Sequence, residues 1–320
     1  MSKAWLKRVY EETEAGDRLL GPFVRARAWW AGGGWRSDRA QVVRDFRRVF
    51  GRAPDLLHPK TLNEKLAWMK LHVRDSRQTV AADKAAVREL VARAAGREHL
   101  VPLLGTWRRA EEVPFGELPE AFVLKVNHGS GQNLVVRDKA ALDVRKTRLQ
   151  LRRWLRANHY AASREWPYRD IEPRIVAEVL LADGDGRLPE DYKFHCFGGR
   201  AEFIQVDLDR ETAHRRNFYD REWNLLPFLW CEVDGAGGPA WPNGRAVAKP
   251  VELGEMIALA EKLAAPWPYV RIDLFNVAGK ILFGEITFYH GSGLEPFFPA
   301  EVDAQLGAFL PKFPVPQGMA

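Results

Sequence analysis

The sequence predicts an α+β protein, and two observations support this prediction. Apolar residues recur at helical spacing in the first hundred residues, whereas from about residue 121 they alternate with a period of two. Helical spacing returns between the strand-like segments, at 147–160 and 251–266. Helices followed by mostly antiparallel strands, with further helices between them, are typical of an α+β fold.

The first helices lie in the N-terminal quarter of the chain. Residues 1–50 are predicted to be helical and basic, and they are interrupted at 31–35 (AGGGW), where the glycines indicate a hinge or turn. A second helical stretch covers 61–72. Thr61 can cap it, and Glu64 three residues later completes the pattern of a capping box.

Another helix spans 82–96, with Asp83 as its N-cap and Gly96 at its end. Beyond it, the period of two predicts short strands, several of them joined as hairpins by glycine-containing turns. The strand-like segments are 121–126, 133–137, 175–181, 191–197, 201–209, 270–277 and 281–287.

The composition is that of a soluble globular protein, since the 320 residues are 46% hydrophobic and 28% charged. The two cysteines, Cys196 and Cys231, belong to no metal-binding pattern, so we expect both to be packing residues in a reducing cytoplasm. The N-terminus does not resemble a signal peptide, and no apolar run of about 18 residues predicts a membrane span. Peripheral membrane association and the oligomeric state stay open.

The net charge of the chain is +6. We interpret this excess of positive charge as favouring an anionic ligand such as a nucleotide, or an anionic surface. No nucleic-acid-binding motif accompanies the charge, so we expect no nucleic acid among the partners.

The final hairpin carries the clearest chemical pattern. With a turn at 278–280, Asp273 lies opposite Glu285. Arg271 lies opposite Thr287 and on the same face, because strand side chains alternate. Two carboxylates and a hydroxyl oxygen suit Mg²⁺ with phosphate co-ligands, and the arginine would contact the phosphate or the developing charge. The competing interpretation is an exposed face with a salt-bridge cluster.

The loop at 127–132 (NHGSGQ) lies between two predicted strands, and Lys125 precedes it. Backbone N–H groups at Gly129, Ser130 and Gly131 could bind phosphate, with the lysine as a point charge. The spacing matches neither of the common glycine-rich nucleotide motifs. Because the loop follows one strand and precedes another, we interpret it as a flap over phosphates. A plain hairpin turn is the alternative.

A third set lies on the hairpin formed by 191–197 and 201–209. With a turn at 198–200, Lys193 faces Gln205, and Asp191 faces Asp207. We expect these four side chains to form a solvent-facing wall, opposite a face of apolar residues that packs in the core. An ordinary amphipathic hairpin would show the same pattern.

Taken together, these segments resemble the ATP-grasp superfamily, and most closely its TupA-like group, which is linked to cell-surface polymer biosynthesis. The resemblance extends from about residue 42 to 310. It rests on the order and spacing of HPKTLNEKLAWMKLH, ADKAAVREL, FVLKVNHGSGQN, IVAEVLL, DYKFHCFGG, RNFYDREWN and RIDLFNVAGKILFGEITFYHGSG.

The resemblance implies an ATP-grasp fold in three parts. The first is an N-terminal helical and α/β region on the substrate side, which we place at 1–110. The second, at 111–180, is a small lid subdomain that carries the glycine-rich flap. The third, at 181–320, is an antiparallel-sheet subdomain with the metal site.

The resemblance also implies a nucleotide-binding set. Lys84 and Lys125 would be the two lysines that reach the phosphates of ATP. Glu178 would be the hinge acid near adenine and ribose, and the backbone of Val179 and Leu180 would bind the adenine edge.

The metal carboxylates implied by the resemblance are Asp273 and Glu285. Thr287 stands where many ATP-grasp enzymes have asparagine, although the TupA-like group also reads E-x-T. His290 and the glycines after it resemble the segment that closes the site. Together with the hairpin patterns, this gives Arg271, Lys193 and Arg216 as candidate catalytic residues.

The implied chemistry is ligation through an acylphosphate, with ATP and Mg²⁺, between a carboxylate and an amine-type nucleophile. A polysaccharide uronic acid joined to an amino acid is our leading expectation, and a peptide-like metabolite is the other. Arg210, Arg215 and Arg216 could hold an acidic substrate, or they could lie in a solvated loop. Trp223 and Trp230 could stack on a sugar, although packing is the commoner use of tryptophan.

Two other functions compete with this one. A glycosyltransferase of polysaccharide assembly would use the Asp-x-Asp pattern seen at 183–185 and 207–209, although DGDG also reads as a turn. A non-catalytic nucleotide sensor or scaffold would bind ATP without turnover. Release of ADP that depends on an acceptor would support the ligase, and release of UDP or GDP would support the glycosyltransferase. ATP binding without release of a product would support the sensor or scaffold.

Overall fold

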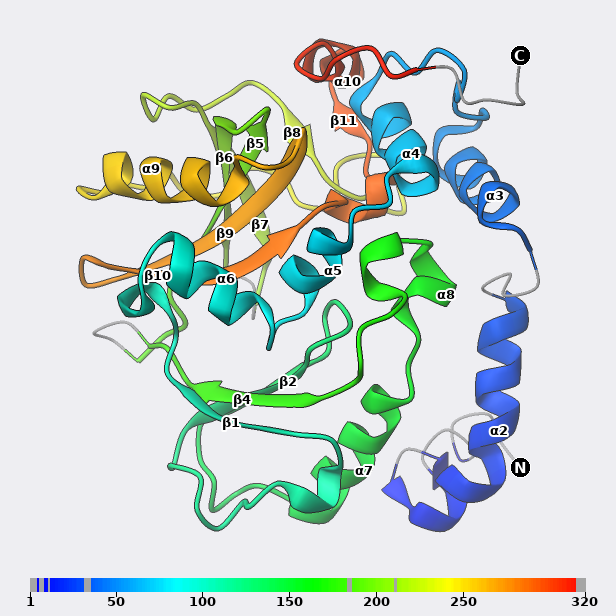
Figure 1. Cartoon of the computed structure of the whole chain (residues 1–320), viewed down its shortest axis with the longest axis vertical. Helices are drawn as coiled ribbons and strands as arrows, with labels where there is room; N and C mark the ends of the chain where they lie inside the picture. Colours follow the sequence, from blue (N-terminus) through cyan, green and yellow to red (C-terminus); the bar gives the residue numbers. More distant parts are fainter. Residues whose placement is uncertain are drawn as a thin grey trace. The chain divides into compact units, whose positions relative to one another are not determined.

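The computed structural model describes Trp5 and residues 9–10, 12–31, 36–182, 186–209 and 212–314 (Figure 1). The glycines of the predicted hinge at 31–35, the Asp-x-Asp pattern at 183–185 and Arg210 lie outside the described residues.

The chain divides into two compact units, each made of segments that are not consecutive. Unit 1 comprises 1–37, 79–87 and 101–180, and unit 2 comprises 38–78, 88–100 and 181–320.

Helices come first along the chain and antiparallel strands follow, with further helices between them, as expected for an α+β fold. The helices are α2 Glu14–Ala31, α3 Asp38–Phe50, α4 Leu62–His72, α5 Ser76–Ala82, α6 Val87–Ala94, α7 Val144–Leu155, α8 His159–Ser163, α9 Leu253–Ala264 and α10 Val302–Gly307. Short 3₁₀ turns occur at Arg97–His99, Ala110–Glu112, Trp166–Tyr168 and His290–Gly293. The strands are β1 Leu103–Trp107, β2 Phe122–Val126, β3 Asn133–Val136, β4 Ile175–Val179, β5 Asp191–Phe197, β6 Arg200–Leu208, β7 Arg215–Tyr219, β8 Leu229–Trp230, β9 Tyr269–Val277, β10 Lys280–Thr287 and β11 Phe297–Phe298.

Unit 1 contains a four-stranded antiparallel sheet in the order β1-β4-β2-β3. Phe122 and Leu124 of β2 and Ala177 of β4 face a core that includes Leu151 of α7. Because strand side chains alternate, Lys125 and its neighbours on β4 lie on the opposite face of this sheet. The sheet therefore has one apolar face and one face that carries charged residues.

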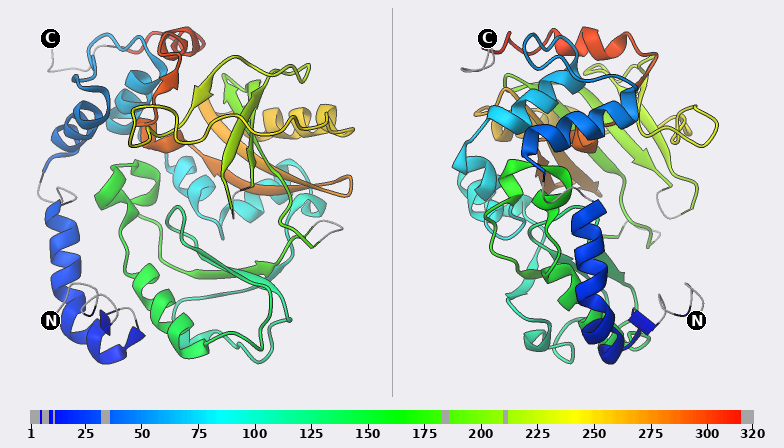
Figure 2. Two further views of the ribbon diagram at one scale, coloured as in Figure 1. Left: turned by 180° about the vertical axis from the view of Figure 1, so that it is seen from behind. Right: turned by 90° about the vertical axis from the view of Figure 1, so that its right-hand side faces the viewer.

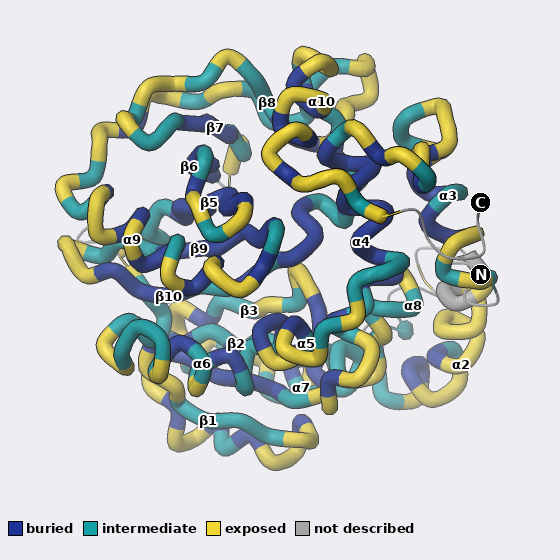
Figure 3. The backbone as a smooth tube through the Cα atoms, turned by 45° about the horizontal axis from the view of Figure 1, so that its top comes forward, coloured by how far each residue is buried: buried dark blue, intermediate teal, exposed yellow. Residues whose placement is uncertain are grey.

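Unit 2 is built on a five-stranded antiparallel sheet in the order β10-β9-β5-β6-β7. Helix α9 packs along β9, β5 and β6, as Figure 2 shows from two further directions. Strands β5 and β9 are dark blue over most of their length in Figure 3, because their side chains are buried on both faces of the sheet. Burial on both faces means that any charged side chain on these strands needs a charged partner.

The β5–β6 and β9–β10 hairpins of this sheet have a tighter turn than the sequence predicted. Gly198-Gly199 and Ala278-Gly279 are two-residue turns in which every φ is positive, between +51° and +85°. One extra residue then follows as a β-bulge, at Glu202 in the first hairpin and at Gly284 in the second. The predicted three-residue turns are therefore wrong, but the bulge restores the predicted register beyond it.

The predicted helix at 82–96 is also shorter than expected. Helix α5 ends at Ala82 and α6 begins only at Val87, so Lys84 lies in the turn between them. The Asp83 carboxylate accepts hydrogen bonds from the N–H groups of the next turn, at 2.8 and 3.2 Å. Gly96, with φ +112°, follows the end of α6 as predicted.

The capping box of α4 is confirmed, and Glu64 does more than the motif requires. Its carboxylate accepts hydrogen bonds from the backbone N–H groups of Asp55, Lys60 and Thr61, at 3.1–3.2 Å, and from Arg52 at 2.5 Å. Glu64→Gln should lower the free energy of unfolding by about 1–3 kcal/mol. The NH₂ group of the glutamine would face N–H donors that then lose their acceptor. Urea unfolding at pH 7 measures this.

The same change should be pH-dependent. Burial alone would raise the pKa of Glu64, but Arg52 and the backbone N–H groups lower it below its ordinary value. The stabilisation is thus present above the ordinary pKa of about 4.3 and is lost as the pH falls through the lower folded-state pKa. The difference between wild type and Glu64→Gln should shrink there. An equal loss of stability from Glu255→Gln, an exposed acid on α9, would contradict the assignment.

Candidate functional site

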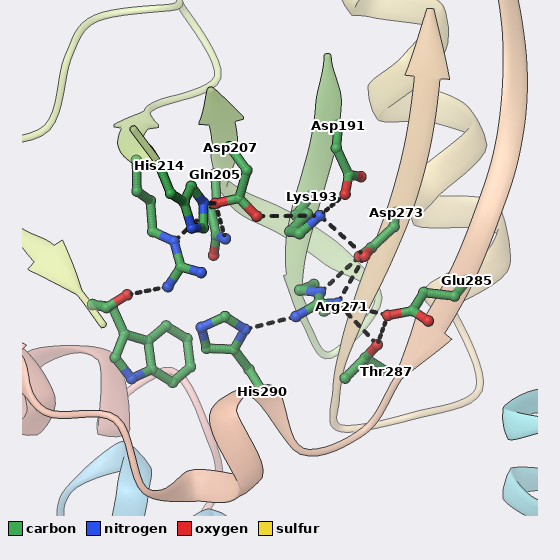
Figure 4. Close-up of polar contacts among 12 residues, drawn as sticks. Asp191, Lys193, Gln205, Asp207, His214, Arg271, Asp273, Glu285, Thr287 and His290 are labelled. Carbon is green, nitrogen blue, oxygen red and sulfur yellow. Dashed lines mark hydrogen bonds and ion pairs between the residues drawn. The ribbon is translucent and has the colours of Figure 1, made fainter. Parts of the chain in front are cut away.

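A row of polar side chains crosses one face of the unit 2 sheet, from β10 through β9, β5 and β6 to β7 (Figure 4). The register brings Glu285 opposite Asp273, Asp273 opposite Lys193, and Lys193 opposite Gln205. The two hairpins that the sequence treats separately therefore form one continuous polar surface. The predicted shared face of Arg271, Asp273, Glu285 and Thr287 is confirmed.

Arg271 is the centre of this row. Its guanidinium donates to both carboxylate oxygens of Asp273, at 2.6 and 2.7 Å. It also donates to Glu285 at 2.9 Å and to the Thr287 hydroxyl at 3.1 Å, and that hydroxyl contacts the same Glu285 oxygen at 3.0 Å. A positive charge therefore already lies between the two acids, and it is an arginine.

Lys193 is the second cation of the row. Its ammonium group forms ion pairs with Asp191, with Asp207 at 3.4 Å and with Asp273 at 3.4 Å, as the dashed lines in Figure 4 show. The predicted solvent-facing wall is wrong in one respect: its side chains are buried, because β5 is covered on both faces. These are Asp191, Lys193, Gln205 and Asp207.

Arg216 extends the row to β7. It donates to Asp207 at 2.9 Å, to Glu295 at 3.1 Å and to the Trp230 carbonyl at 2.6 Å. The ring of Trp241 stacks over its guanidinium, at 4.4 Å. Arg216 therefore lies inside the protein and is bound by two carboxylates, which differs from the solvated loop or arginine cluster that we considered.

His290 lies between Arg271 and Glu295. Its Nδ1 accepts from Arg271 at 2.8 Å, and its Nε2 lies 3.0 Å from Glu295. Burial, together with the neighbouring Arg271 and Arg216, holds the pKa of His290 well below its ordinary value. The neutral ring can thus accept from Arg271 through Nδ1, whereas Nε2 is close to Glu295 but forms no hydrogen bond with the residues that the structure describes.

Burial and charge act in opposite directions on the acids. Burial raises the pKa of Asp273, although Arg271 and Lys193 oppose the rise. Burial would also raise the pKa of Asp207, but Lys193 and Arg216 hold it well below its ordinary value. Asp207, which begins the 207–209 Asp-x-Asp pattern, is therefore already neutralised by two cations.

The donor set of Asp273, Glu285 and Thr287 consists of oxygens, which is the type that Mg²⁺ prefers. Within the described ranges, no three His, Cys, Asp or Glu side chains converge as a site for a metal held by protein alone. Mg²⁺ at this row would thus need phosphate or water oxygens as further ligands, and it would compete with Arg271 for Glu285.

A second charged group lies in unit 1, on the face of the sheet opposite its core. Lys125 on β2 forms an ion pair with Glu178 on β4, at 2.5 Å. The register makes them diagonal neighbours, since Lys125 pairs with Val176. The N–H of Val179 already donates to the Pro102 carbonyl, at 3.1 Å.

The predicted flap follows β2 directly. The Lys84 ammonium donates to the Gly129 carbonyl at 2.6 Å, so the turn after α5 touches the glycine-rich loop. Asn127 fixes the base of the loop, donating to Asp83 at 3.0 Å and accepting from the Arg174 N–H at 2.7 Å. Beyond this base, Ser130 and Gly131 are exposed. The structure thus brings together Lys84, Lys125, Glu178 and the loop within one unit.

The remaining sequence expectations concern packing. Cys196 and Cys231 are fully buried, as expected. Trp223 stacks on Tyr219 at 4.3 Å, and Trp230 packs against His290 and other rings, so both serve packing.

Glu295 and His195 were missed by the sequence analysis. His195 on β5 has the same strand alternation as Asp191 and Lys193, so its side chain lies on the same face. The pairing of β5 with β9, which places it opposite Arg271, would have revealed it. Glu295 follows the site segment without any local pattern, so the sequence offers no signal for it.

The comparison with protein families matches residues 64–311 to the family described as TupA-like ATPgrasp. The chain belongs to this family. As a TupA-like protein it has the ATP-grasp fold. Among curated proteins, the comparison found no match.

Several solved structures match the TupA-like chain at low identity. D-alanine–D-alanine ligase from Bacillus anthracis is 16% identical, with a TM-score of 0.38 over 65% of this chain and 57% of that one. The ATP-grasp ligase PsnB, solved with a minimal precursor, Mg and ADP, is 13% identical, with a TM-score of 0.36 over 71% and 57%. A RimK-domain ATP-grasp protein from Sphaerobacter thermophilus is 12% identical, with a TM-score of 0.37 over 73% and 69%.

The chain thus spans 57% of the length of the first two of these structures. At such TM-scores the likenesses add nothing to the family assignment. Among the described residues, no helix is long and apolar enough to cross a membrane.

Proposed function

We propose that this protein is an ATP- and Mg²⁺-dependent carboxylate ligase, forming ADP. A substrate carboxylate attacks the γ-phosphate of ATP, which gives an acylphosphate and ADP. An amine-type nucleophile then attacks the acyl carbon, and inorganic phosphate leaves with the bonding pair. The observation that carries the proposal is the polar row of unit 2, in a chain that belongs to the TupA-like ATP-grasp family.

In this proposal the residues of unit 1 bind the nucleotide. Lys84 and Lys125 act as point charges toward the phosphates, and the N–H groups of 129–131 add hydrogen bonds to them. Glu178 serves the ribose and adenine side. The adenine contact that we expect from the Val179–Leu180 backbone falls mainly to Leu180, since the Val179 N–H is already used.

The residues of unit 2 hold the metal and stabilise charge. Asp273, Glu285 and Thr287 would bind Mg²⁺, which shields the phosphate charges when bound. Arg271, released from Glu285, would donate to the transferring phosphoryl group. Lys193 and Arg216 fix the acids of the row in place, and a role nearer the reaction stays a prediction for both.

The substrates follow from the family link and stay general. A uronic acid of a cell-surface polysaccharide joined to an amino acid is our first proposal, and a peptide-like metabolite is the second. Nothing specific favours the glycosyltransferase alternative, because Asp207 is buried and bound by Lys193 and Arg216. An acceptor screen scored by ADP release tests the ligase. UDP or GDP release from sugar nucleotides would overturn it, as would ATP binding without turnover on any acceptor.

Nucleotide binding is tested separately from turnover. ATP or ADP with Mg²⁺ at about 100 times its Kd should stabilise the native protein by about 2.7 kcal/mol, seen as a rise in Tm. Lys125→Met should reduce this rise by more than half, because the phosphates lose a cation. Lys146→Met, an exposed lysine on α7, should leave the rise unchanged. No rise with millimolar nucleotide, or an equal loss in both variants, would contradict the nucleotide assignment.

A further inference from the structure

Helix α2 (Glu14–Ala31) is attached to α7 through its only two acidic residues. Asp17 is 5% exposed and forms ion pairs with Arg153 at 3.2 Å and Arg156 at 2.5 Å. Glu14 pairs with Arg152 at 3.0 Å. No acidic residue follows in the helix sequence EAGDRLLGPFVRARAWWA. The sequence of α2 beyond Asp17 therefore contains only apolar, neutral and cationic residues.

Large apolar side chains are exposed along α2. Leu19 is 72% exposed, Phe23 75% and Trp30 62%. At 100° per residue these three positions fall within about 40° of one another around the helix axis. We call them the α2 stripe. Figure 3 shows the helix largely in yellow, and every residue from 22 to 27 is exposed.

Arginines flank the α2 stripe on both sides. By the same spacing, Arg27 lies about 80° to one side of Leu19, and Arg18 and Arg25 lie about 100–120° to the other. All three are exposed. An apolar line between two cationic edges is the arrangement of a helix that lies in the interface of a membrane, where arginine reaches the headgroups.

We propose that the α2 stripe docks this protein on a membrane surface that contains anionic phospholipid. Aromatic and aliphatic side chains enter the boundary of the acyl chains, and the three arginines bind lipid phosphates. A second copy of α2 fits this face less well, because two such helices would set arginines against arginines without an intervening acid. The helix precedes residues 64–311 that match the family, so the proposal does not depend on the proposed ligase activity.

The first test is co-sedimentation of the full chain with vesicles. Vesicles of phosphatidylcholine with phosphatidylglycerol should bind the protein, and vesicles of phosphatidylcholine alone should bind it weakly. The double variant Phe23→Ser/Trp30→Ser should bind about tenfold or more weakly. Two large apolar side chains that no longer enter the membrane lose more binding free energy than a tenfold change in Kd represents. Val251→Ser, at a position that is 95% exposed in unit 2, should bind as wild type.

The second test separates the stripe from overall charge. Arg18→Gln/Arg25→Gln/Arg27→Gln should abolish the preference for phosphatidylglycerol. The matched control also removes three exposed arginines, but in unit 2, and should keep most of the preference. Its positions are Arg93, Arg97 and Arg200. Equal losses in the two triple variants would mean that net charge alone attracts the protein, and this would overturn the proposal.

The third test reports insertion directly. Cys196 and Cys231 are fully buried, so a polarity-sensitive thiol dye should label only an introduced cysteine. Dye on Leu19→Cys should shift to the blue with phosphatidylglycerol vesicles, whereas dye on Val251→Cys should not. Melting curves of each variant establish that it is folded. No blue shift, no sedimentation of the wild type, or self-association that Phe23→Ser/Trp30→Ser abolishes without any vesicle binding would each overturn the proposal.

Discussion

Replacing Glu285 by glutamine is expected to abolish acceptor-dependent ADP release while the protein stays folded. The glutamine keeps the shape of the side chain but removes the charge that we propose to bind Mg²⁺ beside Asp273. We expect a fall in kcat/KM of at least about 10²-fold, since a metal ion supplies several kcal/mol of charge stabilisation. The change in the free energy of unfolding should stay within about 1 kcal/mol, because the Glu285 side chain is 32% exposed.

The structure makes this experiment sharper than the sequence did. Arg271 lies between the acids, so Glu285→Gln leaves Asp273 with its two hydrogen bonds from the guanidinium. A Glu285→Gln protein that turns over normally with Mg²⁺ but melts earlier would show that the row is only a salt-bridge cluster. Glu252→Gln, which changes an acid bound to Asn276 near the turn of the same hairpin, is the control and should keep full activity.

Replacing Lys193 by methionine is expected to lower the free energy of unfolding by about 3–5 kcal/mol. This is the largest loss of stability that we expect among the proposed variants. The lysine side chain is 7% exposed, and its ammonium group is the shared partner of Asp191, Asp207 and Asp273. Methionine fills the space but leaves three buried carboxylates with less positive charge. Urea unfolding measures the loss, and Lys280→Met at the exposed start of β10 should lose almost nothing.

A double variant distinguishes charge balance from packing. If the loss comes from unbalanced carboxylates, Lys193→Met/Asp191→Asn should be more stable than Lys193→Met alone, because one of the unpaired charges is removed as well. A double variant that is less stable than the single one would show that shape, and not charge, makes Lys193 necessary. ADP release by the refolded variants would show whether the lysine also acts in the reaction.

The hairpins show what local pattern can predict. Alternation along β9 and β10 fixed which side chains share a face, since any register that buries the apolar residues must place Asp273 and Glu285 together. The predicted turn lengths were wrong. A two-residue turn followed by a bulge gives the same register as a three-residue turn, so the pattern of alternation does not distinguish them. The fold class and the family likewise depend on order and spacing along the chain, which are local properties.

The burial of the polar row was not predictable in the same way. Lys193 alternates like any solvent-facing residue, and only the pairing of β5 with β9 shows that its side chain lies among acids of another hairpin. Lys84 contacts Gly129, which is 45 residues away in the sequence, and Glu295 contacts Arg216, which is 79 residues away. Contacts over such separations depend on tertiary packing, for which a single sequence carries no periodic signal. The discontinuous composition of both units has the same cause.

The β-bulge at Gly284 has a consequence for reading the sequences of relatives. A relative whose hairpin has a three-residue turn and no bulge would have the same number of residues between the two acids and would hold them opposite each other. The two chains would then align without a gap, although the residues between turn and bulge have cross-strand partners that differ by one position. Comparisons within the family should therefore be anchored on Asp273 and Glu285, and the cross-strand partners of residues 280–283 should not be transferred by alignment alone.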